Sequence, residues 1–268
     1  MSQLEKPSKG YVTVATKEKS FLASAINLCE SILDFDINAK VTLFTEQKFV
    51  DTENLSMFDK VIVPPKDPYI NIKNGAGPRE KMWGMANTPY DLTLYLDADI
   101  EIIHEDILSV FDRLEDNYDM VWVELKRETA GHFAMWDWGN GDIDHLTHCG
   151  GVCLYRASNP LVREFMLDWY NIHMDMRSGV NPPEECKNVP KAFWKWDQLT
   201  AWWLIWHSHK YKEIKWKFFE DNYRWNYYSS FGFNLDGTHN YGVVDPVVVH
   251  HSSTLDKFGK GVYENVPS

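Results

Sequence analysis

The sequence has little that is typical of a secreted, disulfide-bonded or membrane-spanning protein. It has four cysteines in 268 residues and no Cys-x-x-Cys pair, and its first residues, MSQLEKPSKG, are polar, unlike a signal peptide. The longest wholly apolar run, 201-AWWLIW-206, is far shorter than a membrane span. These absences predict a cytoplasmic protein with reduced thiols and no stable membrane insertion.

Positive charge is also scarce. The chain has 27 Lys and Arg against 39 Asp and Glu, so its formal net charge is -12. A nucleic-acid-binding protein usually carries a basic face, so we expect no nucleic-acid partner. An enzyme this acidic that acts on an anionic substrate needs local positive charge, from a metal ion or from a few Lys and Arg side chains.

Aromatic residues are abundant, with 12 Trp, 13 Tyr and 14 Phe, and 44% of the chain is hydrophobic. This content is enough for a sizeable core, and we expect a single domain over 1–268, with 1–102 and 103–268 as its two halves. Most of the aromatic residues are expected to pack in that core. Tryptophan can alternatively stack on a sugar ring, because one face of a pyranose is apolar. Four tryptophans in predicted loops could form such a platform: Trp136, Trp138, Trp194 and Trp196.

Strand and helix patterns alternate along the first half and predict an α/β fold with a mostly parallel, Rossmann-like sheet. Predicted strands there are 11–16, 40–46, 60–65 and 92–96, and predicted helices are 17–35 and 79–87. In the second half the predicted strands are 119–125, 150–156, 213–219 and 243–251. Predicted helices follow Asn159-Pro160 and cover about 196–208, with loops over 126–148 and 178–191.

Two aspartates, Asp97 and Asp99, follow the apolar strand 92-LTLYL-96. If the strand continues through Ala98, both carboxylates point the same way, because side chains alternate along a strand. Two nearby anions repel unless a cation lies between them. At the carboxyl end of a parallel strand, where open α/β sheets bind ligands, oxygen ligands favour Mg²⁺ or Mn²⁺.

Two other interpretations of this acidic stretch compete with a Mg²⁺ or Mn²⁺ site. A calcium loop of the EF-hand type is excluded, because its sixth position is Ile102 where Gly is needed and its twelfth is Leu108 where Glu is needed. A solvated strand end, with one aspartate capping the following turn, stays open on the residues alone.

The segment 78–114 resembles the nucleotide-sugar glycosyltransferases of the GT-A fold, and most of all family 8, the glycogenin and galactosyltransferase group. The resemblance rests on a Lys-bearing helix, an apolar strand, the Asp-x-Asp pair and the helix start 105-EDILSVFDRL-114. Three further segments match in the family's order: 150-GGVCLYRAS-158, 196-WDQLTAWW-203 and 247-VVVHHSS-253. Two departures are Cys149-Gly150 in place of the family's Asn-Ser, and the lack of a Gly-x-x-Lys-Pro-Trp motif after His250, where Lys257 and Lys260 are the possible substitutes.

The resemblance implies a metal-dependent hexosyl- or pentosyltransferase that uses a nucleoside-diphosphate sugar, UDP-linked by preference, and a glycan or glycoprotein acceptor. It implies Mn²⁺ or Mg²⁺ held by Asp97, Asp99 and His250, with His251 as the alternative imidazole. The cation would screen the donor phosphates and stabilise the leaving nucleoside diphosphate. Lys81 or Arg79 would contact a phosphate or the donor sugar, and Thr16 the base or ribose.

The same resemblance assigns Asp197 and Gln198 to the catalytic centre. In a retaining enzyme they would bind hydroxyls of the donor sugar or the acceptor, and the departing phosphate would take the proton. On the residues alone, Asp197 as an ordinary helix cap stays open. In an inverting enzyme Asp197 would be the general base. His148 is expected to contact the donor sugar or the acceptor. Three alternatives stay open: a zinc site at His145, His148, Cys149 and Cys153; a catalytically silent carbohydrate-binding protein; and a sugar nucleotidyltransferase, which the lack of a Gly-rich, Arg-containing loop after the first strand disfavours.

Overall fold

The computed structural model describes residues 6–65, 79–114, 117–124, 148–187, 189, 191, 194, 197–228 and 244–251. Within these ranges no helix combines the length and the apolar character needed to cross a bilayer. Several residues considered above lie outside the described ranges, and the structure does not place them: Trp136, Trp138, Trp196, His145, Lys257 and Lys260.

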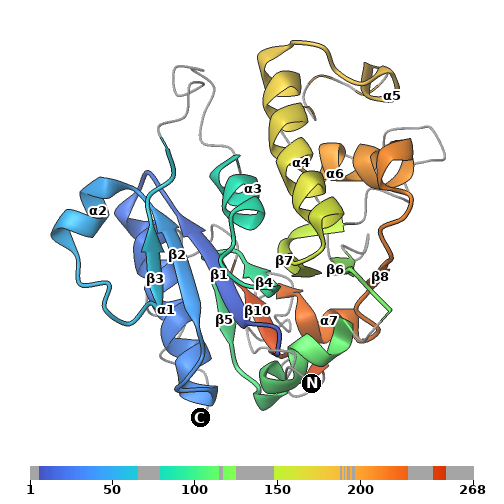
Figure 1. Cartoon of the computed structure of the whole chain (residues 1–268). Helices are drawn as coiled ribbons and strands as arrows, with labels where there is room; N and C mark the ends of the chain where they lie inside the picture. The colour runs from blue at the N-terminus through green and yellow to red at the C-terminus, as the bar shows by residue number, and fades with distance from the viewer. Residues whose placement is uncertain are drawn as a thin grey trace, which may run out of the picture.

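A seven-stranded sheet forms the centre of the molecule, in the order β3-β2-β1-β4-β7-β6-β8 (Figure 1). Its strands are β1 (Lys9–Ala15), β2 (Val41–Thr45), β3 (Lys60–Ile62), β4 (Leu92–Leu96), β6 (Met120–Glu124), β7 (His148–Arg156) and β8 (Trp216–Phe218). Neighbouring strands from β3 to β4 are parallel, as are β6 and β8, whereas β7 is antiparallel to both its neighbours. The predicted mostly parallel sheet is therefore confirmed.

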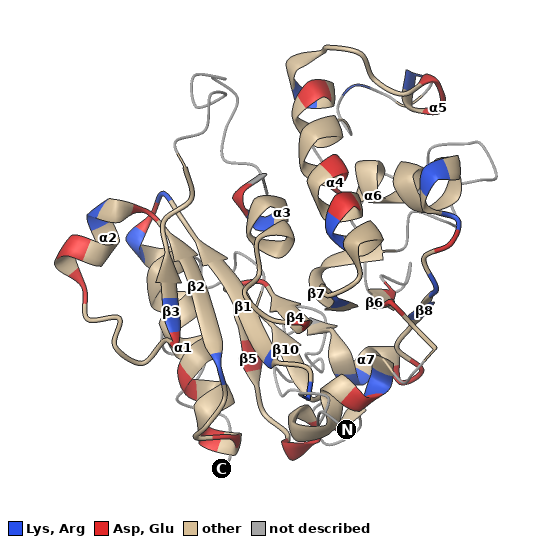
Figure 2. Ribbon diagram, in the orientation of Figure 1, with Lys and Arg blue, Asp and Glu red and all other residues tan. Residues whose placement is uncertain are grey.

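Helices cover both faces of this sheet, because its strands are apolar on both sides. The helices of the described residues are α1 (Lys19–Phe35), α2 (Gln47–Thr52), α3 (Arg79–Ala86), α4 (Pro160–Ser178), α5 (Glu184–Lys187), α6 (Asp197–Trp206) and α7 (Asn222–Trp225), with 3₁₀ segments η1 (Glu105–Leu114) and η5 (His209–Tyr211); of these, α5 packs on α6 and not on the sheet. Along β4, Leu94 and Leu96 pack with α1 and η1, and Tyr95 packs with α3 and α4. Figure 2 shows few charged residues on the central strands and many on the helices.

The longest helix, α4, begins and ends where its sequence predicts. The Asn159 side chain caps it by accepting a hydrogen bond from Leu161 N at 3.0 Å, and Pro160 is its first residue. Gly179 ends it at φ 72°, a left-handed conformation that glycine adopts without strain. The predicted cap and start are confirmed.

A second, three-stranded sheet was only partly anticipated. It has the order β5 (Ile100–Ile102), β10 (Val248–His250) and β9 (Tyr227–Tyr228), with β10 antiparallel to β5 and parallel to β9. The predicted strand over 243–251 is shorter than expected because Asp245, with φ 48°, and Pro246 interrupt it. This small sheet brings the end of the described chain beside the end of β4.

Candidate functional site

A tight turn follows β4 and carries both aspartates. The Asp97 N–H donates to Gly151 O at 2.8 Å, and the Ile100 N–H donates back to Asp97 O at 3.2 Å. The expectation that the strand continues through Ala98 is wrong, because β4 ends at Leu96 and Ala98 and Asp99 form the turn. The turn, and not strand alternation, brings the two carboxylates to one side.

The second sheet places His250 beside this acidic turn. In the pairing of β5 with β10, His250 lies opposite Ile100, the residue that follows Asp99. Its Nε2 lies 3.2 Å from Asp99 Oδ1. One ligand atom each from Asp97, Asp99 and His250 can be chosen so that all three lie within 4.8 Å of one another. His251 points elsewhere, since its Nε2 contacts Glu101 Oε2 at 2.9 Å.

These three side chains fit a divalent cation of the predicted kind. Two carboxylates and one imidazole form a donor set that suits Mn²⁺, and Mg²⁺ also accepts the carboxylates. Of the three, His250 is buried and the aspartates are partly exposed. The residues present are therefore compatible with the implied metal.

The protonation of Asp99 and His250 reflects their contact. Burial alone would raise the pKa of Asp99, but the facing His250 outweighs burial and the net pKa is lowered. Burial alone would lower the pKa of His250, and the Asp99 carboxylate again outweighs it, so that pKa is raised. The pair thus holds opposite charges when no other cation is near.

Lys81 reaches from α3 into the same place. Its Nζ lies 3.0 Å from Asp97 Oδ1 and 3.4 Å from Asp197 Oδ2. Tyr95 completes the surroundings: its hydroxyl donates to Asp97 Oδ1 at 2.8 Å, and its ring centroid lies 5.3 Å from Lys81 Nζ. Burial alone would lower the pKa of Lys81, but Asp97 and Asp197 outweigh it and raise that pKa. The ammonium therefore stays charged between two carboxylates.

Two consecutive glycines in β7 make room for these side chains. A Cβ on Gly150 would lie 2.8 Å from Asp197 Oδ2 and 2.9 Å from Lys81 Nζ. A Cβ on Gly151 would lie 2.8 Å from His250 Cε1 and 2.9 Å from Asp97 Oδ2. The register of β6 and β7 also shifts at this point. A Gly pair inside an apolar strand is a sequence signal for such a close approach. The sequence prediction for 150–156 was a strand alone.

Asp197 and Gln198 lie at the start of α6, next to this group. Asp197 is buried, and its backbone carbonyl accepts a hydrogen bond from Trp169 Nε1 at 2.9 Å. Gln198 Oε1 is buried and has no hydrogen-bond partner among the described residues. His173 on α4 is fully buried, and burial, with Arg177 adding to it and Asp197 opposing it, lowers its pKa to about 4. The structure thus brings Asp197 to Lys81 and leaves an amide oxygen of Gln198 available to a ligand.

The other predicted site residues lie around the group rather than in it. Thr16 follows β1, half-buried, at the same sheet edge as Asp97. Arg79 is the first residue of α3. His148 is buried, and its ring packs edge-on against Trp122 and Trp216.

The remaining alternatives concern tryptophan and cysteine. Trp194, the one platform tryptophan that the structure describes, donates to Val189 O at 3.0 Å and packs on a small core around Met176. The zinc alternative includes His145, which lies outside the described residues. Its Cys149 and Cys153 are buried thiols outside any disulfide, and among the described residues the group that could hold a metal lies at the acidic turn.

The sheet, the covering helices and the acidic turn after β4 define the GT-A fold of glycosyltransferases. No protein-family model matches the sequence, and no curated protein matches it closely enough to count as a relative.

Solved structures match over nearly the whole chain. The glycosyltransferase GlyE of Streptococcus pneumoniae is 14% identical with a TM-score of 0.55, and the match covers 94% of this chain and 57% of GlyE. The galactosyltransferase LgtC, solved with donor and acceptor sugar analogs, is 13% identical with a TM-score of 0.53, and the match covers 91% of this chain and 87% of LgtC. A glycosyltransferase for the major capsid of PBCV-1 is 11% identical with a TM-score of 0.50, over 95% of this chain and 99% of that one. The chain thus spans little more than half of GlyE, and at these identities the likeness shows the fold.

Proposed function

We propose that this protein is a metal-dependent glycosyltransferase. It moves a hexose or pentose from a nucleoside-diphosphate sugar, UDP-linked by preference, to a hydroxyl of a glycan or glycoprotein. The observation that carries the proposal is the convergence of Asp97, Asp99 and His250 at the carboxyl end of β4 in a GT-A fold. The donor class draws support from LgtC, which binds donor and acceptor sugar analogs on a similar fold. Membership of family 8 and a cytoplasmic location are parts of the same proposal.

Each group of the site has a role in this proposal. Asp97, Asp99 and His250 hold Mn²⁺ or Mg²⁺, which, when bound, screens the donor pyrophosphate and stabilises the nucleoside diphosphate as it leaves. Lys81 adds a fixed positive charge on the β7 side of Asp97 and orients the donor sugar or a phosphate. Thr16 contacts the base or ribose, Arg79 contacts a phosphate or the donor sugar, and His148 contacts the donor sugar or the acceptor.

Asp197 and Gln198 bind hydroxyl groups of the transferred sugar. The free buried Oε1 of Gln198 accepts one such hydrogen bond, which would satisfy an oxygen that is costly to bury alone. One oxygen of Asp197 is already paired with the Lys81 ammonium. This pairing favours a binding role for Asp197 and a retaining reaction, in which the departing phosphate takes the acceptor proton. An inverting reaction with Asp197 as base is the alternative.

The test is release of UDP from a panel of UDP-sugars in the presence of Mn²⁺. We expect turnover, or slow donor hydrolysis, with at least one sugar, and its loss with EDTA and in Asp99→Asn. Asp51→Asn is the matched control, because Asp51 is an exposed aspartate that contacts Gln47 on α2. Glycan binding that survives both EDTA and Asp99→Asn, with no turnover for any donor, would instead identify a catalytically silent carbohydrate-binding protein.

A further inference from the structure

We propose that Asn226 is a positioning residue that determines which ring nitrogen of His250 faces the metal site. This inference rests on the metal-dependent function proposed above. Its basis is a contact on the far side of the imidazole from the two aspartates, made by a residue outside the segments that resemble glycosyltransferases.

The contact joins two buried side chains. His250 Nδ1 lies 3.2 Å from Asn226 Oδ1, and the two residues are 6% and 5% exposed. An amide oxygen only accepts hydrogen bonds, so Nδ1 carries a proton and donates it. In the metal-free protein Nε2 also carries a proton, which it donates to Asp99 Oδ1 at 3.2 Å. A bound cation would take the Nε2 lone pair in place of that proton, so Nε2 is the nitrogen directed into the group of candidate ligands.

The backbone of β7 fixes the position of the ring. Gly151 lies so close that a Cβ there would be 2.8 Å from His250 Cε1 and 3.3 Å from Nδ1. The ring edge between its two nitrogens thus packs on Gly151. Asn226 lies on one side of that edge and Asp99 on the other. A histidine ligand needs this kind of outer partner to hold one tautomer and one ring orientation.

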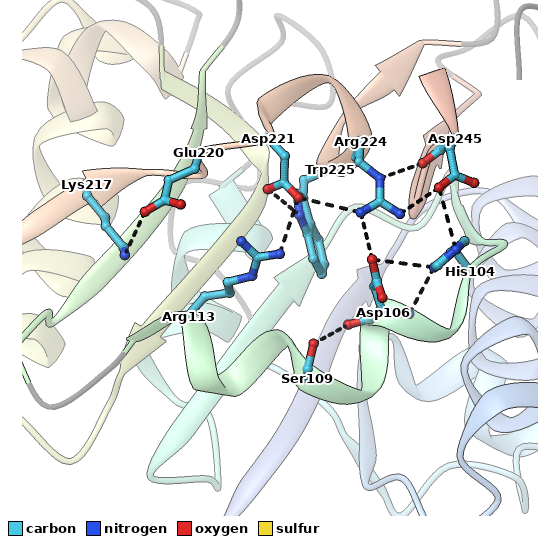
Figure 3. Close-up of polar contacts among 10 residues, drawn as sticks. All are labelled: His104, Asp106, Ser109, Arg113, Lys217, Glu220, Asp221, Arg224, Trp225 and Asp245. Atoms are coloured by element: carbon cyan, nitrogen blue, oxygen red, sulfur yellow. Dashed lines mark hydrogen bonds and ion pairs between the residues drawn. The ribbon is translucent and has the colours of Figure 1, made fainter. Parts of the chain in front are cut away.

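An ion-pair network around Arg224 (Figure 3) lies close in the sequence to both Asn226 and His250, which are 24 residues apart. Arg224, at the end of α7, donates to Asp245 O at 2.7 Å and Asp106 Oδ2 at 2.7 Å. The Val247 N–H donates to Arg224 O at 2.7 Å. Asn226 lies two residues after Arg224, and His250 lies three residues after Val247. The network therefore fixes the end of α7, which Asn226 follows, and β10, which ends at His250.

The experiment uses Asn226→Leu, which removes the acceptor, and Asn226→Asp, which keeps an acceptor oxygen. The first measurement is nitrogen-15 NMR of the His250 ring in the metal-free protein, which follows the exchange of the Nδ1 proton with water, with the signal assigned by its loss in His250→Gln. The second is calorimetric titration with Mn²⁺ alone. Asn159→Ala is the control, because it removes an asparagine that also accepts a hydrogen bond, far from the site at the start of α4.

We expect slow exchange of the Nδ1 proton in the wild type and in Asn226→Asp, and fast exchange in Asn226→Leu, where no acceptor faces Nδ1. The Kd for Mn²⁺ should rise about 10- to 100-fold in Asn226→Leu, as for other outer partners of histidine ligands. In Asn226→Asp and Asn159→Ala the Kd for Mn²⁺ should rise no more than about threefold, since both variants retain an acceptor facing His250 Nδ1.

Three results decide the matter. Unchanged exchange of the Nδ1 proton together with unchanged Mn²⁺ affinity in Asn226→Leu would overturn the role of Asn226. A large loss of Mn²⁺ affinity in Asn226→Asp would do the same, even if Asn226→Leu fails to fold. Failure of the wild type to bind Mn²⁺ would count against the proposed function, while exchange of the Nδ1 proton in the metal-free protein would still decide whether Asn226 holds the ring.

Discussion

The Lys81 ammonium lies 3.0 Å from Asp97 Oδ1, so a cation from the chain itself neutralises one of the two carboxylates proposed to bind a metal. Lys81 is 8% exposed and also pairs with Asp197. Buried charges of this kind require partners of opposite charge, because removal of one partner leaves an uncompensated buried charge. Lys81 therefore links the acidic turn to the start of α6.

Lys81→Met should destabilise the metal-free protein by about 3 kcal/mol, because it leaves two carboxylates without their cation. Urea unfolding in EDTA measures this loss. Added Mn²⁺ should recover part of it, since a divalent cation can neutralise Asp97 instead. Lys9→Met is the control: its pair with Asp112 is exposed, and its removal should cost less than about 1 kcal/mol. Equal losses for the two variants would contradict the proposed coupling.

Gly151→Ala should lower the affinity for Mn²⁺ while the protein stays folded. The added methyl would press on the His250 ring and on Asp97 Oδ2, and the backbone on either side is held in the sheet. We expect a loss of about tenfold or more by calorimetry, as for other changes that misplace a ligand. Gly179→Ala tests the opposite case: open space but a positive φ of 72°, so it should cost about 1 kcal/mol of stability and leave metal binding unchanged.

His173 predicts a loss of stability in mild acid. Its folded pKa of about 4 lies below the unfolded value near 6.5, so below about pH 6.5 the unfolded chain binds a proton that the folded protein refuses. Stability is therefore full above that pH and falls toward pH 4. The loss between pH 7.5 and pH 5 should be about 2 kcal/mol more in the wild type than in His173→Leu. Parallel pH curves for the two proteins would show that His173 titrates normally.

Arg224→Lys should weaken Mn²⁺ binding although Arg224 lies outside the metal site. A lysine cannot make the forked contacts with Asp245 and Asp106 that hold β10 in place. We expect the Kd for Mn²⁺ to rise about tenfold, by analogy with other outer positions. Arg113→Lys is the comparison, because Arg113 contacts Asp221 at 3.3 Å in the same network without touching Asp245 (Figure 3). A larger effect at Arg113 would contradict this account of the network.

Local sequence patterns were enough to predict the core of the fold. The strand 92–96 follows from an apolar run, and the start of α4 follows from Asn159-Pro160. Both signals involve only residues that are neighbours in the chain. The metal group was predicted in composition but not in geometry. Its convergence depends on the turn at Asp97 and on the pairing of β5 with β10, and no local pattern encodes contact between residues so far apart.

The outer residues of the site were not predictable for a related reason. Asn226 is one of many asparagines, and only the folded chain shows that it faces His250. The pairing of Lys81 with Asp197 likewise depends on two helices packed over Gly150. Residues whose role depends on tertiary contact carry no signal in spacing alone.

The most direct test of the central claim is the anomalous scattering of manganese in crystals grown with Mn²⁺ and UDP. The account predicts one strong peak bounded by Asp97, Asp99 and the Nε2 of His250, with the UDP phosphates on its open side, and no such peak in Asp99→Asn crystals. A peak elsewhere in the protein, or UDP bound with no manganese at the acidic turn, would contradict it.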